Sequence, residues 1–246
     1  MRSRYGTSIV DLKVLPVIFE LRLYSVAPGR MADCHARFRD HFPALFRRHG
    51  IACIGRWTAT AGPDAPRFVY MMAYQSYAER EACWDSFYKD DEWWRLRAET
   101  NAGSEMIERH DLYFLKANTS WKDSGTAIKT STAGLHELVF HEVAAGQSAA
   151  ATAFLESTWL PALREAGATI MAVFDMASGV RMPQVVLLYA WRNATHRESG
   201  WAALNNNKQI NEAWDEQRRK LGHTILTRSE VNLLEPSAYA LPFSSI

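Results

Sequence analysis

The stretch FELRLYSVAPG, residues 19–29, decides the fold because the chain uses it twice. Apolar and polar residues alternate along it, which predicts a β-strand, and Pro28-Gly29 predicts a turn after that strand. Shifted by 117 residues, from 19 to 136, the chain reads HELVFHEVAAG, with Glu, Leu, Val, Ala and Gly at matching positions. The same strand and turn are therefore expected at residues 136–146.

The repeat extends well beyond this strand. With the same offset, residues 19–84 lie over 136–201 without a gap. About sixteen of the roughly 66 aligned pairs are identical, which is about four times the number expected by chance. The chain is therefore expected to be a tandem duplication. Among the retained residues are Glu20, Arg80 and Trp84, which recur as Glu137, Arg197 and Trp201.

Each copy has the periodicity of a strand, a helix, two strands, a helical region and a last strand. This βαββαβ order predicts an α+β fold of two tandem ferredoxin-like repeats, each a four-stranded antiparallel sheet with helices on one face. Pro43 is expected to bend the first helix, and Gly50 and Gly167 to end the first helix of each copy. The expected first strands are 18–26 and 135–143, and the first helices are 30–49 and 147–166.

The Ser-, Thr-, Gly- and Lys-rich stretch between the copies predicts a linker. The expected organisation is an N-terminal arm at 1–16, repeat 1 at 17–116, a linker at 117–133, repeat 2 at 134–236 and a C-terminal tail at 237–246.

A sheet covered by helices on one face needs a partner for its other face. We expect the two open faces to be packed sheet-to-sheet, as an α/β barrel that resembles a dimer within one chain. In copy one Phe19, Leu21 and Leu23 are expected to face the helices. The candidate pocket residues are then those expected inside the barrel, namely Glu20, Arg22, Tyr24, Glu137 and His141.

Each of these side chains has a functional and a structural interpretation. A shielded Glu20 or Glu137 could act as a general base, or it could form an ion pair that supports the fold in both copies. Arg22 and Tyr24 could clamp a ligand carboxylate or phenolate, or form an internal salt bridge.

The sequence contains no pattern typical of a metal or nucleotide site. His136 and His141 are five residues apart on a predicted strand, whereas the two histidines of the HExxH zinc motif are four residues apart on a helix. His110 as a haem ligand is the minor alternative to a surface or core histidine. Neither a Gly-rich phosphate loop nor a CxxC pair is present. We expect no metal and no cofactor.

The formal net charge of +1 gives no electrostatic signal for nucleic acid or anionic membranes. No apolar run reaches the roughly 18 residues that a membrane span needs. The cysteine number, three, is odd, and the N-terminus lacks a secretory apolar region, so an intracellular, cytoplasmic protein is expected.

Four motifs in copy one resemble the NIPSNAP family of dimeric α/β-barrel proteins. They are FELRLYSVAPGR, RRHGIACIGRWTA, VYMMAYQSYAERE and DDEWWRLR, the last similar to an acidic helix motif of that family with Asp91, Glu92 and Trp93 in register. The resemblance is weaker in copy two, where Lys208-Gln209-Ile210 replaces the acidic motif. It implies an α/β barrel similar to proteins that bind small organic molecules, some of them cofactor-free monooxygenases or haem enzymes, and it carries no catalytic residues with it.

Two functions follow as expectations. In the first, the barrel binds a small aromatic or carboxylated molecule, with a cofactor-independent enzyme as one form of this function. In the alternative, the chain is a non-catalytic interaction or scaffold module. Only one of Trp93 and Trp94 can face inward on a helix, so the other is expected to mark an interface, and a homo-oligomer is predicted.

Overall fold

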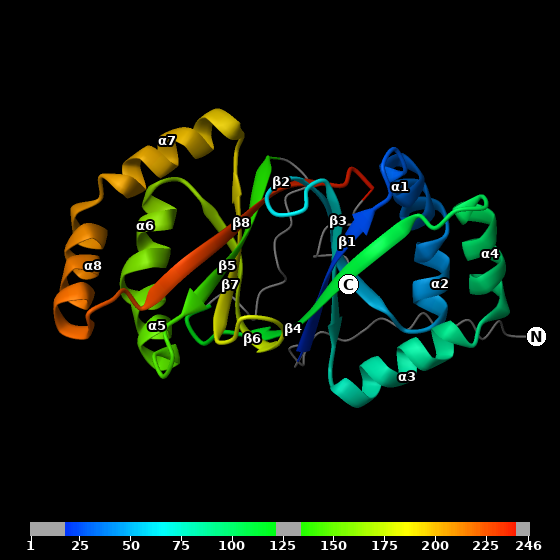
Figure 1. Cartoon of the computed structure of the whole chain (residues 1–246), viewed down its shortest axis with the longest axis horizontal. Coiled ribbons are helices and arrows are strands. Elements are labelled where there is room, and N and C mark those ends of the chain that lie inside the picture. Colours follow the sequence, from blue (N-terminus) through cyan, green and yellow to red (C-terminus); the bar gives the residue numbers. More distant parts are fainter. Residues whose placement is uncertain (1–17, 122–133, 240–246) are drawn as a thin grey trace, which may run out of the picture.

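The computed structural model describes residues 18–121 and 134–239, and it shows strands in the centre with a group of helices at each end (Figure 1). The predicted arm at 1–16 and most of the predicted linker lie outside the described residues. Copy one consists of β1 (Ile18–Val26), α1 (Met31–Asp40), α2 (Phe42–Arg48), β2 (Ala52–Ala61), β3 (Arg67–Tyr74), α3 (Tyr77–Tyr88), α4 (Asp91–Asn101) and β4 (Ile107–Ala117).

Copy two repeats this order. It consists of β5 (Leu135–Val143), α5 (Ser148–Phe154), a π-helical stretch (Leu155–Trp159), α6 (Leu160–Glu165), β6 (Thr169–Ser178), β7 (Gln184–Trp191), α7 (Ala194–Asn205), α8 (Lys208–Leu221) and β8 (Leu226–Pro236). Both copies therefore have the predicted βαββαβ order, and each helical connection except the first one of copy two is divided into two separate helices.

Local sequence signals explain where the helices begin and break. Ser76 caps α3 by accepting a hydrogen bond from the Glu79 amide at 3.0 Å, because that amide has no partner within the first helical turn. The first helix of copy one breaks at His41, just before Pro43 in the first turn of α2. In copy two the corresponding run continues through the π-helical stretch instead of breaking.

The eight strands form one closed barrel in the order β1-β3-β2-β8-β5-β7-β6-β4, with antiparallel pairing. The edges of each four-stranded sheet pair with the edges of the other, β2 with β8 and β4 with β6. Each join is short, with Trp57–Ala61 of β2 beside Leu233–Pro236 of β8 and Phe114–Ala117 of β4 beside Phe174–Ser178 of β6. The predicted α/β barrel of two ferredoxin-like repeats is confirmed.

Aromatic side chains from both copies meet inside the barrel. The Phe19 and Phe174 ring centroids are 4.8 Å apart, and those of Tyr113 and Phe140 are 5.1 Å apart. The indole nitrogen of Trp57 donates to His136 Nδ1 at 3.0 Å. In the barrel interior the two copies thus bury their apolar strand faces against each other.

The two faces of β1 point the opposite way from the prediction. Phe19, Leu21 and Leu23 belong to the core cluster of the barrel interior, whereas Glu20 and Arg22 contact α3. The physical reason is that both faces are buried. The barrel interior takes the apolar set, and α3 supplies Arg80 as a counter-ion for Glu20 on the other face.

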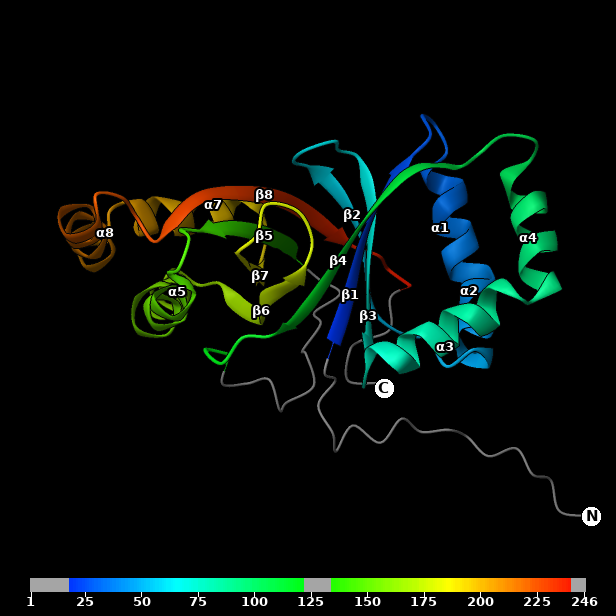
Figure 2. The ribbon, with the colours of Figure 1, turned by 60° about the horizontal axis from the view of Figure 1, so that its bottom comes forward.

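The helices of each copy cover the outer face of its own sheet, as a second view shows (Figure 2). In copy one the layer between sheet and helices has its own core cluster, which includes Phe38, Phe68, Tyr70, Trp84 and Trp93. The molecule therefore has a helix layer, two sheet walls and a second helix layer.

Candidate functional site

A buried ion cluster lies between β1 and α3 in copy one. Glu20 is fully buried, and its Oε1 accepts from Arg22 Nε at 2.6 Å while its Oε2 accepts from Arg80 Nε at 2.9 Å. Arg22 also lies over the ring of Trp84, with its Cζ 3.8 Å from the ring centroid. Two arginines and an aromatic face thus compensate for taking these charges out of water.

Arg22 connects this ion cluster to a pair of tyrosines. Its Nη1 donates to the Tyr24 hydroxyl at 3.2 Å and to the Tyr70 hydroxyl at 3.3 Å, and the two hydroxyls bond to each other. Burial raises the pKa of Tyr24 and raises that of Tyr70 well above its ordinary value, although the positive charge of Arg22 opposes both shifts. Both side chains are therefore neutral phenols at pH 7.

The tyrosine pair has one hydrogen-bond donor more than its own hydrogen bond uses. The two phenols carry two protons, and only one is needed for the bond between the hydroxyls. Arg22 has no acceptor atom, and both oxygens of Glu20 already accept from arginines. One hydroxyl proton of the tyrosine pair is thus available to an acceptor beside it.

A cavity of about 260 Å³ lies beside the tyrosine pair, between the sheet of copy one and its helices. Aromatic side chains form most of its wall. The lining residues are Tyr24, Cys34, Arg37, Phe38, Phe42, Tyr70, Trp84, Phe87, Tyr88, Trp93, Trp94, Arg97, Glu105, Ile107 and His110. We call this space the copy-one cavity.

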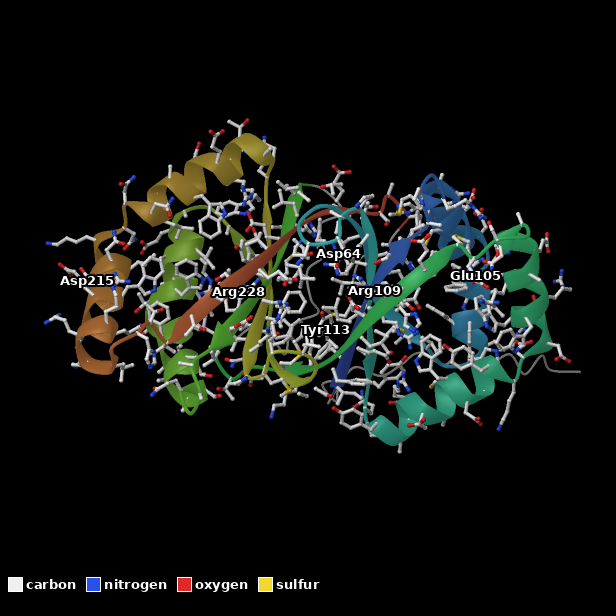
Figure 3. All side chains as sticks on the ribbon, in the orientation of Figure 1. Asp64, Glu105, Arg109, Tyr113, Asp215 and Arg228 are labelled. Carbon is white, nitrogen blue, oxygen red and sulfur yellow. The ribbon has the colours of Figure 1, made fainter. Side chains whose placement is uncertain are left out.

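The polar residues of the wall differ in their chemistry. Burial raises the pKa of the Cys34 thiol to about 12, so Cys34 is not a thiolate at neutral pH. Glu105, in the connection between α4 and β4, accepts from Arg97 at 2.7 Å (Figure 3). His110 is exposed, and its ring centroid is 5.6 Å from that of Tyr24. The Cys34 thiol is therefore a poor nucleophile, and the Glu105 carboxylate already has a cationic partner.

Copy two keeps the central carboxylate but changes its partners. Glu137 is fully buried and accepts from the Tyr189 hydroxyl at 2.7 Å and from the Trp191 indole at 3.0 Å. Arg197, the counterpart of Arg80, forms the ion pair. Val139 stands at the position of Arg22, so phenol and indole donors replace the second guanidinium.

Tryptophans lie in copy two where copy one has its cavity. Trp159 and Trp214 occupy the positions of Phe42 and Arg97 when the 117-residue offset is applied. Their ring centroids are 5.8 Å apart, and Trp159 is also 6.2 Å from the ring of His141. Burial lowers the pKa of His141 to about 4, so this imidazole is neutral at pH 7.

The structure brings together only part of the predicted pocket. Tyr24 lines the copy-one cavity, and Arg22 and Glu20 lie behind it in the ion cluster. Glu137 and His141 lie on the face of β5 that is covered by the helices of copy two. The prediction that these five side chains face the barrel interior is wrong, for the reason given for β1. The alternative ion-pair interpretation describes both glutamates.

Several wall residues were missed at the sequence level, among them Tyr70, Arg37 and Arg97. The signal that could have found them is the difference between the copies. At the matching positions copy two has Leu187, Phe154 and Trp214, so polar residues of copy one correspond to apolar residues of copy two in the alignment.

Within residues 18–121 and 134–239, no group of three or more His, Cys, Asp or Glu side chains is arranged to hold a metal ion. None of the helices in this part of the chain is both long and apolar enough to cross a bilayer.

Comparisons with solved structures agree on the fold. A "putative monooxygenase" from Lactobacillus acidophilus aligns with a TM-score of 0.55 and 12% identity, over 90% of this chain and 94% of that one. A mutant chlorite dismutase from Candidatus Nitrospira defluvii aligns with a TM-score of 0.54 and 8% identity, over 92% and 94% of the two chains. At these identities the likeness shows a shared α/β-barrel fold.

A sequence model of one domain identifies the family. No curated protein matches this sequence. A NIPSNAP family protein from Agrobacterium tumefaciens has 20% identity and a TM-score of 0.38, and it covers 42% of this chain with 94% of its own length. The family model NIPSNAP matches residues 19–120 and again residues 136–240. The chain therefore belongs to the NIPSNAP family, as a tandem repeat of its domain.

Proposed function

We propose that copy one binds a small organic molecule in the copy-one cavity, and that copy two has a structural function. The observation that carries this proposal is the difference between two equivalent places in one chain. Copy one has a space of about 260 Å³ beside paired hydroxyls, whereas Trp159 and Trp214 pack together at the matching place in copy two. The site differs from the barrel interior expected from the sequence.

The size and wall of the cavity favour an aromatic ligand. A cavity of roughly 150 Å³ is enough to bind benzene, so about 260 Å³ suits one substituted ring or two fused rings. Phe38, Phe87 and Trp93 line it and offer ring faces and edges for stacking.

The tyrosine pair gives the ligand an orientation. Because Tyr24 and Tyr70 are neutral and have one spare proton, they can donate a hydrogen bond to a carbonyl, carboxylate or phenolic oxygen. In the enzymatic form of the proposal, which needs no cofactor, the same donor stabilises negative charge that develops on the ligand oxygen.

Thermal-shift screening with aromatic acids, amides and quinones tests this function, because a ligand that binds only the folded chain raises its apparent stability. Tyr70→Phe should weaken binding of a responding compound roughly three- to tenfold, since one hydrogen bond is lost. Tyr189→Phe is the matched control, because it removes a buried hydroxyl from copy two. An equal loss of affinity in both variants, or no response to any compound, would count against the proposal.

Self-association is a second candidate, favoured by two exposed aromatic residues. Trp94 is 48% exposed and Tyr88 is 47% exposed, with ring centroids 6.4 Å apart. We propose that this face contributes to a homo-oligomer. Light scattering should show a smaller assembly for Trp94→Ala than for the unchanged chain, and a monomer in both cases would refute it.

A further inference from the structure

Arg37 is a buried cation in the wall of the copy-one cavity. It lies on α1 and is only 5% exposed. Its Nε donates to Thr100 Oγ1 at 2.8 Å and its Nη2 donates to Asn101 Oδ1 at 2.6 Å, so both acceptors are neutral. Within the described ranges, no residue accepts from Nη1 and no carboxylate forms an ion pair with Arg37.

The charges around Arg37 do not balance it. Glu105, the carboxylate in the same wall, is already paired with Arg97 at 2.7 Å and accepts from Asn101 at 3.1 Å. Behind the tyrosine pair, Arg22 of β1 and Arg80 of α3 share the single carboxylate of Glu20. These six charged side chains comprise four arginines and two glutamates, which leaves positive charge in excess.

A buried guanidinium without a counter-ion is unfavourable. An arginine remains protonated in proteins, so it cannot avoid the cost of burial by losing its charge. Burial is the largest influence on Arg37 and lowers its pKa; Arg97 and Arg30 add to this effect, whereas Cys34 and Glu105 oppose it. The cost falls when a carboxylate accepts bonds from the free edge of the guanidinium, since such pairs are charge-assisted and directional.

We propose that the ligand of the copy-one cavity is an organic anion, an aromatic carboxylate whose carboxyl group pairs with Arg37. This inference rests on the proposed binding function and deepens it by naming the ligand class. The aromatic wall takes the ring, and the carboxylate supplies the negative charge that the site lacks. At the position of Arg37 copy two has Phe154, so the copy in which Trp159 and Trp214 pack together has no cation there.

The test compares 1-naphthoate with its neutral isostere 1-naphthamide by calorimetric titration of the full chain. The naphthoate should bind the unchanged protein at least tenfold more tightly. Arg37→Met should lose at least tenfold in naphthoate affinity and change naphthamide affinity less than twofold. Arg37→Lys should recover part of the loss, because it restores the charge without the planar geometry.

Arg67→Met is the matched control, because Arg67 is also buried but pairs with Asp111 and Asn232 away from the cavity wall. It should leave both affinities unchanged. Equal affinity of the unchanged protein for the two probes overturns the anion inference and leaves the proposed binding function intact. This comparison uses only the unchanged protein, so it does not depend on whether a variant folds. Binding of neither probe, where another neutral aromatic compound binds, also overturns the anion inference alone. If no aromatic compound binds, both proposals fail.

Discussion

Glu20 and Glu137 occupy matching positions and are stabilised by different donors. Glu20 balances two guanidiniums, one of which, Arg22, is almost fully buried. Glu137 balances Arg197, which is partly exposed, and otherwise accepts from neutral phenol and indole groups. The same residue therefore has a different energetic importance in each copy, since removing a partner from a buried ion pair leaves an uncompensated charge.

Replacing each glutamate by glutamine should reveal this difference. Glu20→Gln should lower the free energy of unfolding by about 3–5 kcal/mol, because Arg22 then stays buried without a carboxylate. Glu137→Gln should cost about 1–3 kcal/mol, since the amide oxygen still accepts from the indoles. Urea unfolding measures both values. A larger loss for Glu137→Gln would contradict the account of the two clusters.

His141 should make stability depend on pH. Its pKa is about 4 in the folded chain, because burial disfavours the charged ring, against about 6.5 in the unfolded chain. The unfolded chain binds the proton first, so the free energy of unfolding should fall as the pH drops from 6.5 to 4 and then lose this dependence. The total is about 3 kcal/mol. Urea unfolding of His141→Phe over this range should show a correspondingly flatter profile, and an unchanged profile would contradict the assignment.

At the level of the elements, the two copies place different side chains at the equivalent position between sheet and helices. The helices α4 and α8 occupy equivalent places, and the first presents Trp93 and Arg97 where the second presents Ile210 and Trp214. Because Trp214 packs against Trp159, copy two fills its helix layer with large rings. Arg97 instead turns toward Glu105 and leaves space beside it.

Giving copy one the residues of copy two should therefore close its cavity. The double variant Phe42→Trp and Arg97→Trp should fold and should lose at least tenfold in affinity for any compound that binds the unchanged protein. Arg95→Trp is the control on the same helix, since Arg95 is exposed and does not line the cavity. Equal affinity of the double variant and the Arg95 control, measured by titration calorimetry, would place the binding site elsewhere.

Sequence periodicity located the elements well but could not orient their faces. The predicted strand at 18–26 agrees with β1 in both bounds. Alternation shows that Glu20 and Leu21 lie on opposite faces, yet it contains no information on which face meets the helices when both are buried. That depends on Arg80, which is distant in sequence and contacts Glu20 only once α3 has packed. Arg37 was missed for a similar reason, because Thr100 and Asn101, which hold its side chain, are distant from it in sequence.

At the scale of the whole molecule, the two copies share one interior. Strand pairing between β2 and β8 and between β4 and β6 closes the barrel, and Phe19 meets Phe174 across it. An ion pair between Asp64 in the β2–β3 hairpin and Arg109 on β4 lies at its rim (Figure 3). Neither copy can bury its apolar strand face without the other, so they should unfold together.

Truncation of an interior ring tests this coupling. Phe174→Ala should lower the free energy of unfolding by about 3–5 kcal/mol, because Phe174 is fully buried against Phe19 and Trp121. Hydrogen exchange should show protection falling in β1 of copy one as well as in β6 of copy two. Loss of protection confined to copy two would mean that the copies are independently stable.

Calorimetric stoichiometry distinguishes binding by copy one alone from binding by both copies. The titrant is the tightest-binding compound from a panel of neutral and anionic aromatic molecules, with 1-naphthoate included. We expect saturation at one molecule per chain and loss of that binding in the Phe42→Trp, Arg97→Trp double variant. Saturation at two equivalent molecules per chain, or no saturable binding by any compound, would contradict it.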